Sequence, residues 1–174
     1  MVRKQLGKYD IIARLGRGGM AEVYKAYQPS LDRFVAIKLL HPFLADDPEF
    51  KDRFEREAKN VAQLRHPNIV QVYDFAFDDE SESYYMVMEL IDGSTLKDHL
   101  TELGSEKLPM GEALRIMRGA TEALAYAHRR SMIHRDVKPA NLMLDNDGRI
   151  ILTDFGIAKI VTGIHFTASG VSAS

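Results

Sequence analysis

A short polar segment between two apolar runs, residues 132–144, carries the residues best suited to chemistry. It places a carboxylate at Asp136, a cation at Lys138 and an amide at Asn141 within one loop. A plain polar turn would account for each residue taken singly, but the set suits a hydroxyl nucleophile, a phosphate and a metal ion. Pro139 removes a backbone donor and fixes φ, so the loop is stiff where positioning matters. The segment is therefore the first candidate for a site.

The order of residues 134–141, His-Arg-Asp-Val-Lys-Pro-Ala-Asn, resembles the H-R-D-x-x-x-x-N catalytic loop of eukaryotic-type protein kinases. The residue types in this segment are similar to those of the Ser/Thr kinases, and the chain looks most like the bacterial membrane-signalling kinases of that family. The resemblance implies an α+β, kinase-like fold. Residues 1–90 would form an N-lobe with a five-stranded antiparallel sheet and helix C, and residues 91–174 part of a mainly helical C-lobe.

The same resemblance implies roles for the polar residues of this segment. Asp136 would accept or orient the proton of the substrate hydroxyl, and Lys138 would steady the γ-phosphate. Thirteen residues after Asn141 comes Asp154-Phe155-Gly156, which looks like the D-F-G element of the family. Asn141 and Asp154 would then hold Mg²⁺. The resemblance also implies an apolar stack made of Phe155, His134, Val61 and Tyr73.

The amino-acid composition excludes several other classes of protein. The 174 residues hold 23 Lys and Arg against 25 Asp and Glu, so no surface for nucleic acid or anionic lipid is indicated. The chain has no Cys, which excludes thiolate metal sites, and its six His are scattered. No apolar run approaches the ~20 residues that cross a bilayer, and the N-terminus does not read as a signal peptide. We expect a cytoplasmic protein without a membrane segment.

A glycine-rich stretch, Gly16–Ala21, lies between two strand-like segments, residues 9–15 and 22–27. Glycines alone are weak evidence because hairpin turns need them, and the dinucleotide fingerprint would open a helix instead. The strand–loop–strand order resembles the kinase flap over the nucleotide phosphates, with Ala21 in place of its third glycine. The resemblance assigns ATP contacts here to Leu15, Gly16, Arg17, Gly18, Gly19, Met20, Ala21, Glu22 and Val23.

Residues 34–40 form an apolar strand with Lys38 inside it. A lysine whose stem lies along an edge strand is the plainer interpretation. However, Val-Ala-Ile-Lys at residues 35–38 matches the family signature whose lysine holds the α- and β-phosphates, and Ala36 would also contact ATP.

Apolar residues every three or four positions predict a helix that starts at Asp47-Pro48 and ends before His66-Pro67. Glu57 borders its apolar stripe, where a carboxylate needs a partner. An exposed glutamate is the alternative. The resemblance pairs Glu57 with Lys38.

Two further strands, residues 69–77 and 84–90, lead into a segment that resembles the hinge of the family. The resemblance places Met88 as gatekeeper and the backbone of Glu89 and Ile91 against adenine, with Met143 as another ATP contact. Helices are predicted over residues 96–103 and 110–130, and short apolar runs at 142–144 and 149–152.

The family pattern stops within residues 157–174, which we expect to be the start of an activation segment, truncated there. The leading hypothesis is ATP- and Mg²⁺-dependent transfer of phosphate to Ser or Thr hydroxyls of proteins in signal transduction, weak or absent in this chain alone. A catalytically silent, nucleotide-binding regulatory module is the alternative. Small-molecule phosphotransfer is a third and less favoured hypothesis. An exposed apolar face on the helix at 110–130 would favour self-association.

Overall fold

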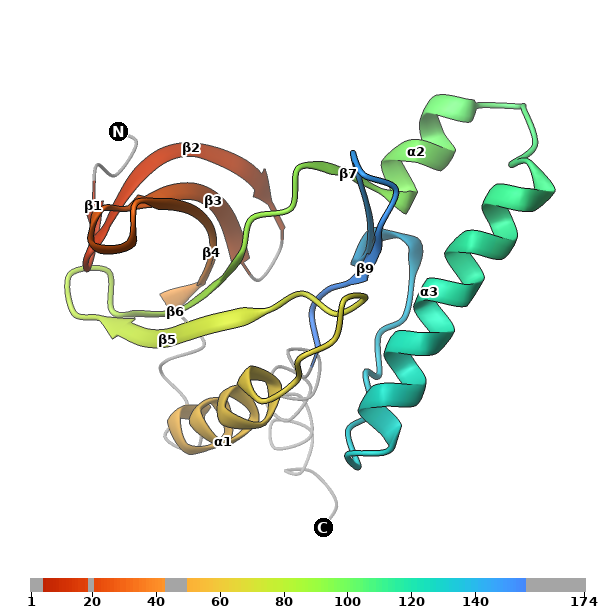
Figure 1. The fold of residues 1–174 in the computed structure, drawn as a ribbon. Coiled ribbons are helices and arrows are strands. Elements are labelled where there is room, and N and C mark those ends of the chain that lie inside the picture. The colour runs from red at the N-terminus through yellow and green to blue at the C-terminus, as the bar shows by residue number, and fades with distance from the viewer. Residues whose placement is uncertain (1–4, 19–20, 43–49, 156–174) are drawn as a thin grey trace, which may run out of the picture. The chain divides into compact units, whose positions relative to one another are not determined.

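The computed structural model describes residues 5–18, 21–42 and 50–155, apart from the side chain of Arg53. Within these ranges the chain forms two units. Residues up to 62 and residues 72–90 make the first, and residues 63–71 and 91–155 make the second. Each unit has its own antiparallel sheet (Figure 1).

A curled sheet of six strands dominates the first unit, in the order β1-β2-β3-β4-β6-β5 (Figure 1). Its strands are β1 (Gln5–Leu6), β2 (Tyr9–Arg17), β3 (Ala21–Gln28), β4 (Arg33–Leu40), β5 (Val72–Asp78) and β6 (Ser83–Glu89). The sheet has one strand more than the five that were expected. The additional strand is β1, because Gln5–Leu6 folds back onto β2 with Leu6 opposite Tyr9. Between β3 and β4 the chain passes through η1 (Pro29–Leu31).

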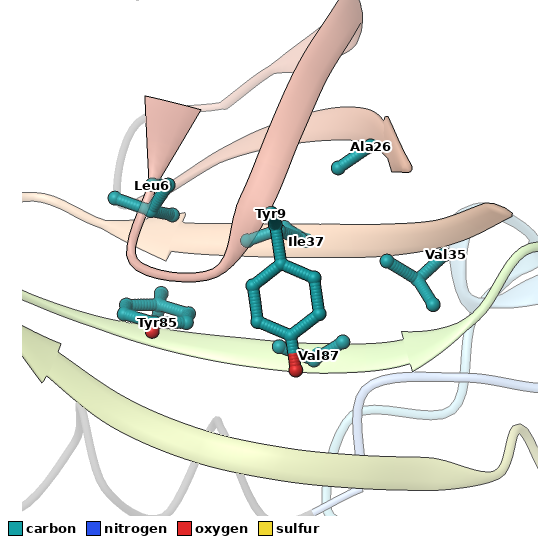
Figure 2. Close-up of a cluster of buried hydrophobic side chains, with 7 residues drawn as sticks. All are labelled: Leu6, Tyr9, Ala26, Val35, Ile37, Tyr85 and Val87. Carbon is teal, nitrogen blue, oxygen red and sulfur yellow. The ribbon is translucent and has the colours of Figure 1, made fainter. Parts of the chain in front are cut away.

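One face of this sheet is the apolar core of the unit. Val35 and Ile37 of β4 lie opposite Ala26 of β3 and Val87 of β6, and directly opposite residues share a face. The buried cluster consists of Leu6, Tyr9, Ala26, Val35, Ile37, Tyr85 and Val87 (Figure 2). Because side chains alternate along a strand, Ala36 and Lys38 point to the opposite face.

The apolar stripe of helix α1 (Phe50–Ala62) is buried within the first unit. Phe50, Phe54, Ala58 and Val61 recur at helical spacing and are each at most 3% exposed. The Phe54 ring meets Phe75 of β5 edge to face, with 5.6 Å between ring centroids. The predicted start of this helix at Asp47-Pro48 lies outside the described residues.

The second unit holds two helices and a small sheet (Figure 1). Its elements are β7 (Gly93–Thr95), α2 (Leu96–Leu103), α3 (Met110–His128), η3 (Pro139–Asn141), β8 (Leu142–Asp145) and β9 (Ile150–Leu152), and the sheet order is β7-β8-β9. Thr95 caps α2 by accepting a hydrogen bond from the Asp98 N–H. Gly119 lets α3 approach β9, since a Cβ there would lie 2.7 Å from Ile150.

The strand predicted over residues 69–77 is divided between the two units. Ile69 forms an isolated parallel bridge with Leu152, and the Val70 N–H donates to the Leu152 carbonyl at 3.1 Å. These residues therefore belong to the second unit, and the strand proper begins at Val72. No helix in the described part of the chain is both long and apolar enough to span a membrane.

Candidate active site

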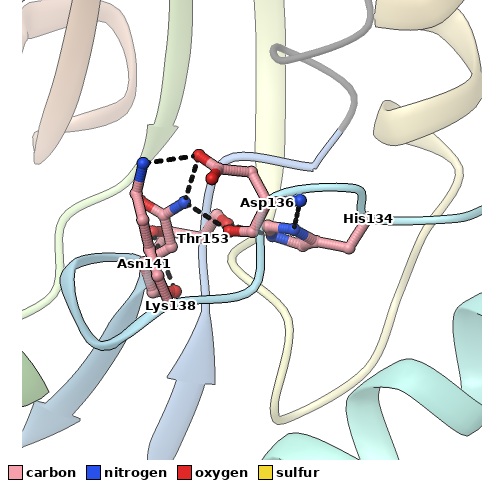
Figure 3. A network of polar contacts seen from close by, with 5 residues as sticks. All are labelled: His134, Asp136, Lys138, Asn141 and Thr153. Atoms are coloured by element: carbon pink, nitrogen blue, oxygen red, sulfur yellow. Dashed lines mark hydrogen bonds and ion pairs between the residues drawn. The ribbon is translucent and has the colours of Figure 1, made fainter.

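Three side chains predicted for the catalytic loop form one network in the second unit (Figure 3). Lys138 Nζ lies 2.8 Å from a carboxylate oxygen of Asp136. The Asn141 side-chain amide donates to the same oxygen at 3.0 Å and to the backbone carbonyl of Asp136 at 2.8 Å. The segment thus brings an acid, a cation and an amide together, as expected.

Backbone bonds hold this loop in place. Pro139 occupies the first turn of η3, where a missing N–H costs nothing. The Asn141 N–H donates to the Lys138 carbonyl at 2.9 Å, and the Thr153 N–H donates to the Asn141 carbonyl at 2.9 Å. Asn141 is only 4% exposed. The loop is therefore fixed to the residues that follow β9.

His134 connects the loop to the same segment. Its ring is 1% exposed, and Nε2 lies 2.6 Å from the Thr153 carbonyl while Nδ1 accepts from the Asp136 N–H at 3.2 Å. A carbonyl only accepts, so the proton of the neutral ring sits on Nε2. The Phe155 ring packs edge-on against it, with 4.5 Å between centroids. Of the predicted apolar stack, His134 and Phe155 are in contact, and Val61 and Tyr73 belong to the first unit.

Electrostatics keep the network in defined protonation states. The hydrogen bond from Lys138 holds the pKa of Asp136 below its ordinary value, and the Asn141 amide acts in the same direction against the effect of burial. Burial lowers the pKa of His134. At neutral pH Asp136 is therefore an ionised acceptor and His134 a neutral ring.

Backbone strain gathers around the same loop. Arg135 and Asp154 have φ values of 70° and 64°, in a region that non-glycine residues rarely adopt. Such conformations persist where the surroundings enforce them, and they are enriched at functional sites. Arg135 precedes Asp136, and Asp154 is itself a predicted metal ligand, so two of the five non-glycine residues with positive φ in the described part of the chain lie at predicted site positions.

The residues present fit a magnesium ion. The Asn141 amide nitrogen is committed to Asp136, so its oxygen is the atom suited to a hard cation, and Asp154 supplies a carboxylate thirteen residues later. Among the described residues no three His, Cys, Asp or Glu side chains gather as a protein-only metal site. Mg²⁺ commonly needs one or two carboxylates and completes its shell with phosphates and water.

Several of the predicted ATP-contacting residues lie on one face of the sheet in the first unit. Gly16 lies opposite Val23, and Val23 lies opposite Lys38. Two positions before Lys38, Ala36 lies opposite Met88, which is 7% exposed. These residues of β2, β3, β4 and β6 lie on the face of the sheet away from the core cluster. On α1, Glu57 is buried at 6% exposure, so the alternative of an exposed glutamate is wrong.

The glycine-rich stretch leaves room for a ligand. Among the described residues, a Cβ built on Gly16 would meet nothing within 4 Å, and one on Gly18 would meet only the Ala21 carbonyl at 3.5 Å. The Gly18 N–H donates to that carbonyl at 2.8 Å and closes the turn. The fold itself therefore does not demand glycine at either position, which fits a backbone that a phosphate group approaches closely.

The positions of the other predicted ATP contacts do not by themselves indicate a nucleotide site. Leu15 is exposed, and Met143 of β8, opposite Thr95, is partly exposed. Gly19 and Met20 lie outside the described residues. Glu89 ends β6, and Ile91 opens the second unit. Sequence reasoning missed Thr153, whose carbonyl and N–H anchor both His134 and Asn141.

Comparison with known proteins supplies the family. Residues 9–172 match the protein kinase domain family. The chain belongs to this family. The chain is 46% identical over 161 residues to serine/threonine-protein kinase PrkC of Bacillus subtilis, covering 92% of this chain and 24% of that protein. It is 44% identical over 172 residues to serine/threonine-protein kinase PknB of Mycobacterium leprae, covering 96% and 27%.

A solved structure agrees with the fold. The crystal structure of the Mycobacterium tuberculosis PknI kinase domain superposes with a TM-score of 0.81 at 38% identity, covering 90% of this chain and 64% of that one. The predicted resemblance to the bacterial Ser/Thr protein kinase family and the predicted kinase-like α+β fold are thus confirmed. The chain spans about a quarter of the length of the curated relatives it matches.

Proposed function

We propose that this chain carries out ATP- and Mg²⁺-dependent transfer of the γ-phosphate to Ser or Thr hydroxyls of proteins. The observation that carries the proposal is the Asp136–Lys138–Asn141 network. It offers one ionised acceptor, one cation and one amide within hydrogen-bonding distance. Phosphoryl transfer needs mainly such positioning and charge, with little covalent chemistry from the protein.

In this proposal Asp136 accepts or orients the proton of the attacking hydroxyl. Its lowered pKa keeps the carboxylate ionised at neutral pH, so that it can accept a hydrogen bond from that hydroxyl. Lys138, held at 2.8 Å from that carboxylate, steadies the γ-phosphate as its negative charge shifts. Asn141 and Asp154 would hold Mg²⁺, which when bound neutralises phosphate charge.

The first unit would bind the nucleotide. Lys38 would hold the α- and β-phosphates and Glu57 would orient it, while the Gly16–Ala21 turn would cover the phosphates. Ala36 would contact ATP, Met88 would be the gatekeeper, and the backbone of Glu89 would pair with adenine, as would the backbone of Ile91, the first residue of the second unit. We retain residues 1–90 and 91–174 as the N-lobe and the partial C-lobe. The relatives are named as bacterial Ser/Thr kinases, and we propose protein substrates, a cytoplasmic location and self-association for this chain.

Two measurements test the proposal. Thermal unfolding with and without Mg-ATP should show a nucleotide-dependent rise in Tm, and Lys38→Met should reduce it. Lys97→Met, which changes an exposed lysine of α2, is the matched control. Transfer of radiolabelled phosphate to a generic protein substrate should be abolished by Asp136→Asn. A Tm shift without any transfer would favour the alternative of a catalytically silent nucleotide-binding module, and the absence of both would contradict the proposal.

A further inference from the structure

A single carboxylate in the first unit collects three neighbouring side chains. Glu22 Oε1 lies 3.2 Å from Arg17 Nε and 3.9 Å from Arg14 Nη1. The Tyr24 hydroxyl donates a hydrogen bond to the other oxygen, Oε2. The Glu22 side chain is 17% exposed although it carries a charge. Arg17 and Glu22 are among the ATP contacts predicted from the family, but that prediction includes neither Arg14 nor Tyr24 and does not explain why the four side chains gather. We call the four residues the Glu22 cluster (Arg14, Arg17, Glu22 and Tyr24).

The Glu22 cluster lies at the mouth of the glycine-rich turn. Arg17 and Glu22 are directly opposite and form the last pair of β2 and β3 before that turn. The next pair inward is Gly16 and Val23. The His41 ring adds a contact from beyond β4, with Nε2 3.4 Å from the Gly18 carbonyl. The two ends of the turn are therefore held by side chains as well as by the ladder.

Physical reasons favour a defined geometry at this point. An isolated exposed ion pair contributes little, because two long side chains must be ordered in water. Here one carboxylate, itself 17% exposed, serves two more exposed guanidinium groups and a hydroxyl, and charges that form a network are the exception to that rule. The hydrogen bond from Tyr24 and the two arginines lower the pKa of Glu22 despite burial. The cluster is thus charged throughout the neutral range.

We propose that Glu22 is a positioning residue, which fixes Arg17 and the ends of β2 and β3 so that the backbone at Gly16 and Gly18 meets the nucleotide phosphates in one geometry. The inference rests on the proposed function, since it needs a bound triphosphate. The open space over Gly16 and Gly18 allows phosphates close to the backbone. The Glu22 cluster supplies the rigidity that the glycines themselves lack.

Comparing two ligands separates positioning from simple stability. Mg-ATP carries the phosphates that the turn would meet, whereas adenosine carries none of them. Glu22→Gln keeps the shape and removes the charge, so it should weaken Mg-ATP binding to the full chain about fivefold, toward the low end of couplings between contacting residues. Adenosine affinity and the Tm of the free protein should stay unchanged. Tyr24→Phe removes one contact only and should give a smaller loss in the same direction.

A double-mutant cycle sharpens the test. Arg17→Gln should weaken Mg-ATP binding in the wild-type background and have little further effect beside Glu22→Gln, because the two residues act through one pair. Glu106→Gln, at an exposed position in the second unit, is the control. Equal losses for Mg-ATP and adenosine, additive effects, or unchanged or tighter Mg-ATP binding in Glu22→Gln would each overturn the inference. If wild-type protein bound no Mg-ATP, the proposed function would fail first, which is a distinguishable result.

Discussion

The side-chain amide of Asn141 donates to the carboxylate of Asp136 at 3.0 Å, across four intervening residues of the loop. The amide thereby holds the candidate base in place, while its oxygen remains the atom suited to a metal ion. One residue would serve both the acceptor and the ion, so its two amide atoms have separate tasks. A change that alters only one of these atoms should expose the distinction.

Asn141→Asp makes that change. It replaces the donor with an oxygen, so two carboxylates would face each other at hydrogen-bonding distance, and like charges at this range raise one pKa or move apart. We expect phosphate transfer to fall by on the order of a hundredfold, as for a misplacement of about 1 Å. Initial rates with radiolabelled ATP measure it. Asn146→Asp, at an exposed turn position, is the control and should leave rates unchanged.

Acid should destabilise the second unit through His134. Its pKa is lowered in the folded chain, mainly by burial, whereas an unfolded imidazole titrates near about 6.5. The stabilisation is therefore complete above about pH 6.5 and declines as the pH falls toward the folded-state pKa. Protonation at Nδ1 would also oppose the Asp136 N–H with a second donor.

Denaturant unfolding between pH 8 and pH 5 measures this effect. We expect the free energy of unfolding to fall with acidification, and His134→Phe to flatten the slope because the ring is kept while the titrating group is removed. His66, whose pKa is also lowered by burial, accounts for part of the remaining slope. An equal slope in wild type and His134→Phe would rule out this role for His134.

Some features of the fold and of the candidate site could be predicted from the sequence and others could not. The order and spacing of the motifs sufficed for the fold family and for the group at Asp136, Lys138 and Asn141, because these residues are close in sequence. The buried position of Glu57 also followed from helical periodicity. The extra edge strand β1 did not, since two residues carry no detectable alternation.

The Glu22 cluster shows a different limit. Which β2 residue lies opposite Glu22 depends on two irregularities in the strand register, between Ile11 and Ala13 and between Arg14 and Gly16. A bulge changes the pairing without changing the apolar pattern that sequence reasoning uses. Thr153 was missed for a different reason: its contributions to the site come from its backbone N–H and carbonyl, which any residue type would supply.

The close approach of β7 and β8 gives a stability prediction. A Cβ added to Gly93 would lie 2.0 Å from the Leu144 carbonyl oxygen and 2.8 Å from the Asp145 Cα. Gly93→Ala should therefore force the strands apart and lower the free energy of unfolding by about 1–3 kcal/mol. Gly111→Ala, in the first turn of α3 with no described residue within 4 Å of an added Cβ, should be neutral or stabilise by up to ~1 kcal/mol. Denaturant unfolding of both variants tests this, and equal effects would contradict it.

An apolar stripe on α3 leads to the last prediction, on self-association. Met110, Leu114 and Met117 follow each other at helical spacing and are 74%, 63% and 64% exposed. Contiguous apolar surface of this kind favours association because its burial removes it from water. We expect sedimentation velocity to show a concentration-dependent shift to larger species. Leu114→Lys with Met117→Lys should restore a monomer, whereas Glu102→Lys, a change at another exposed position, on α2, should not. Exposed apolar surface promotes aggregation at concentrations of about 100 μM. A wild-type chain that stays monomeric at this concentration, or a Glu102→Lys variant that also dissociates, would show that the stripe does not mediate association.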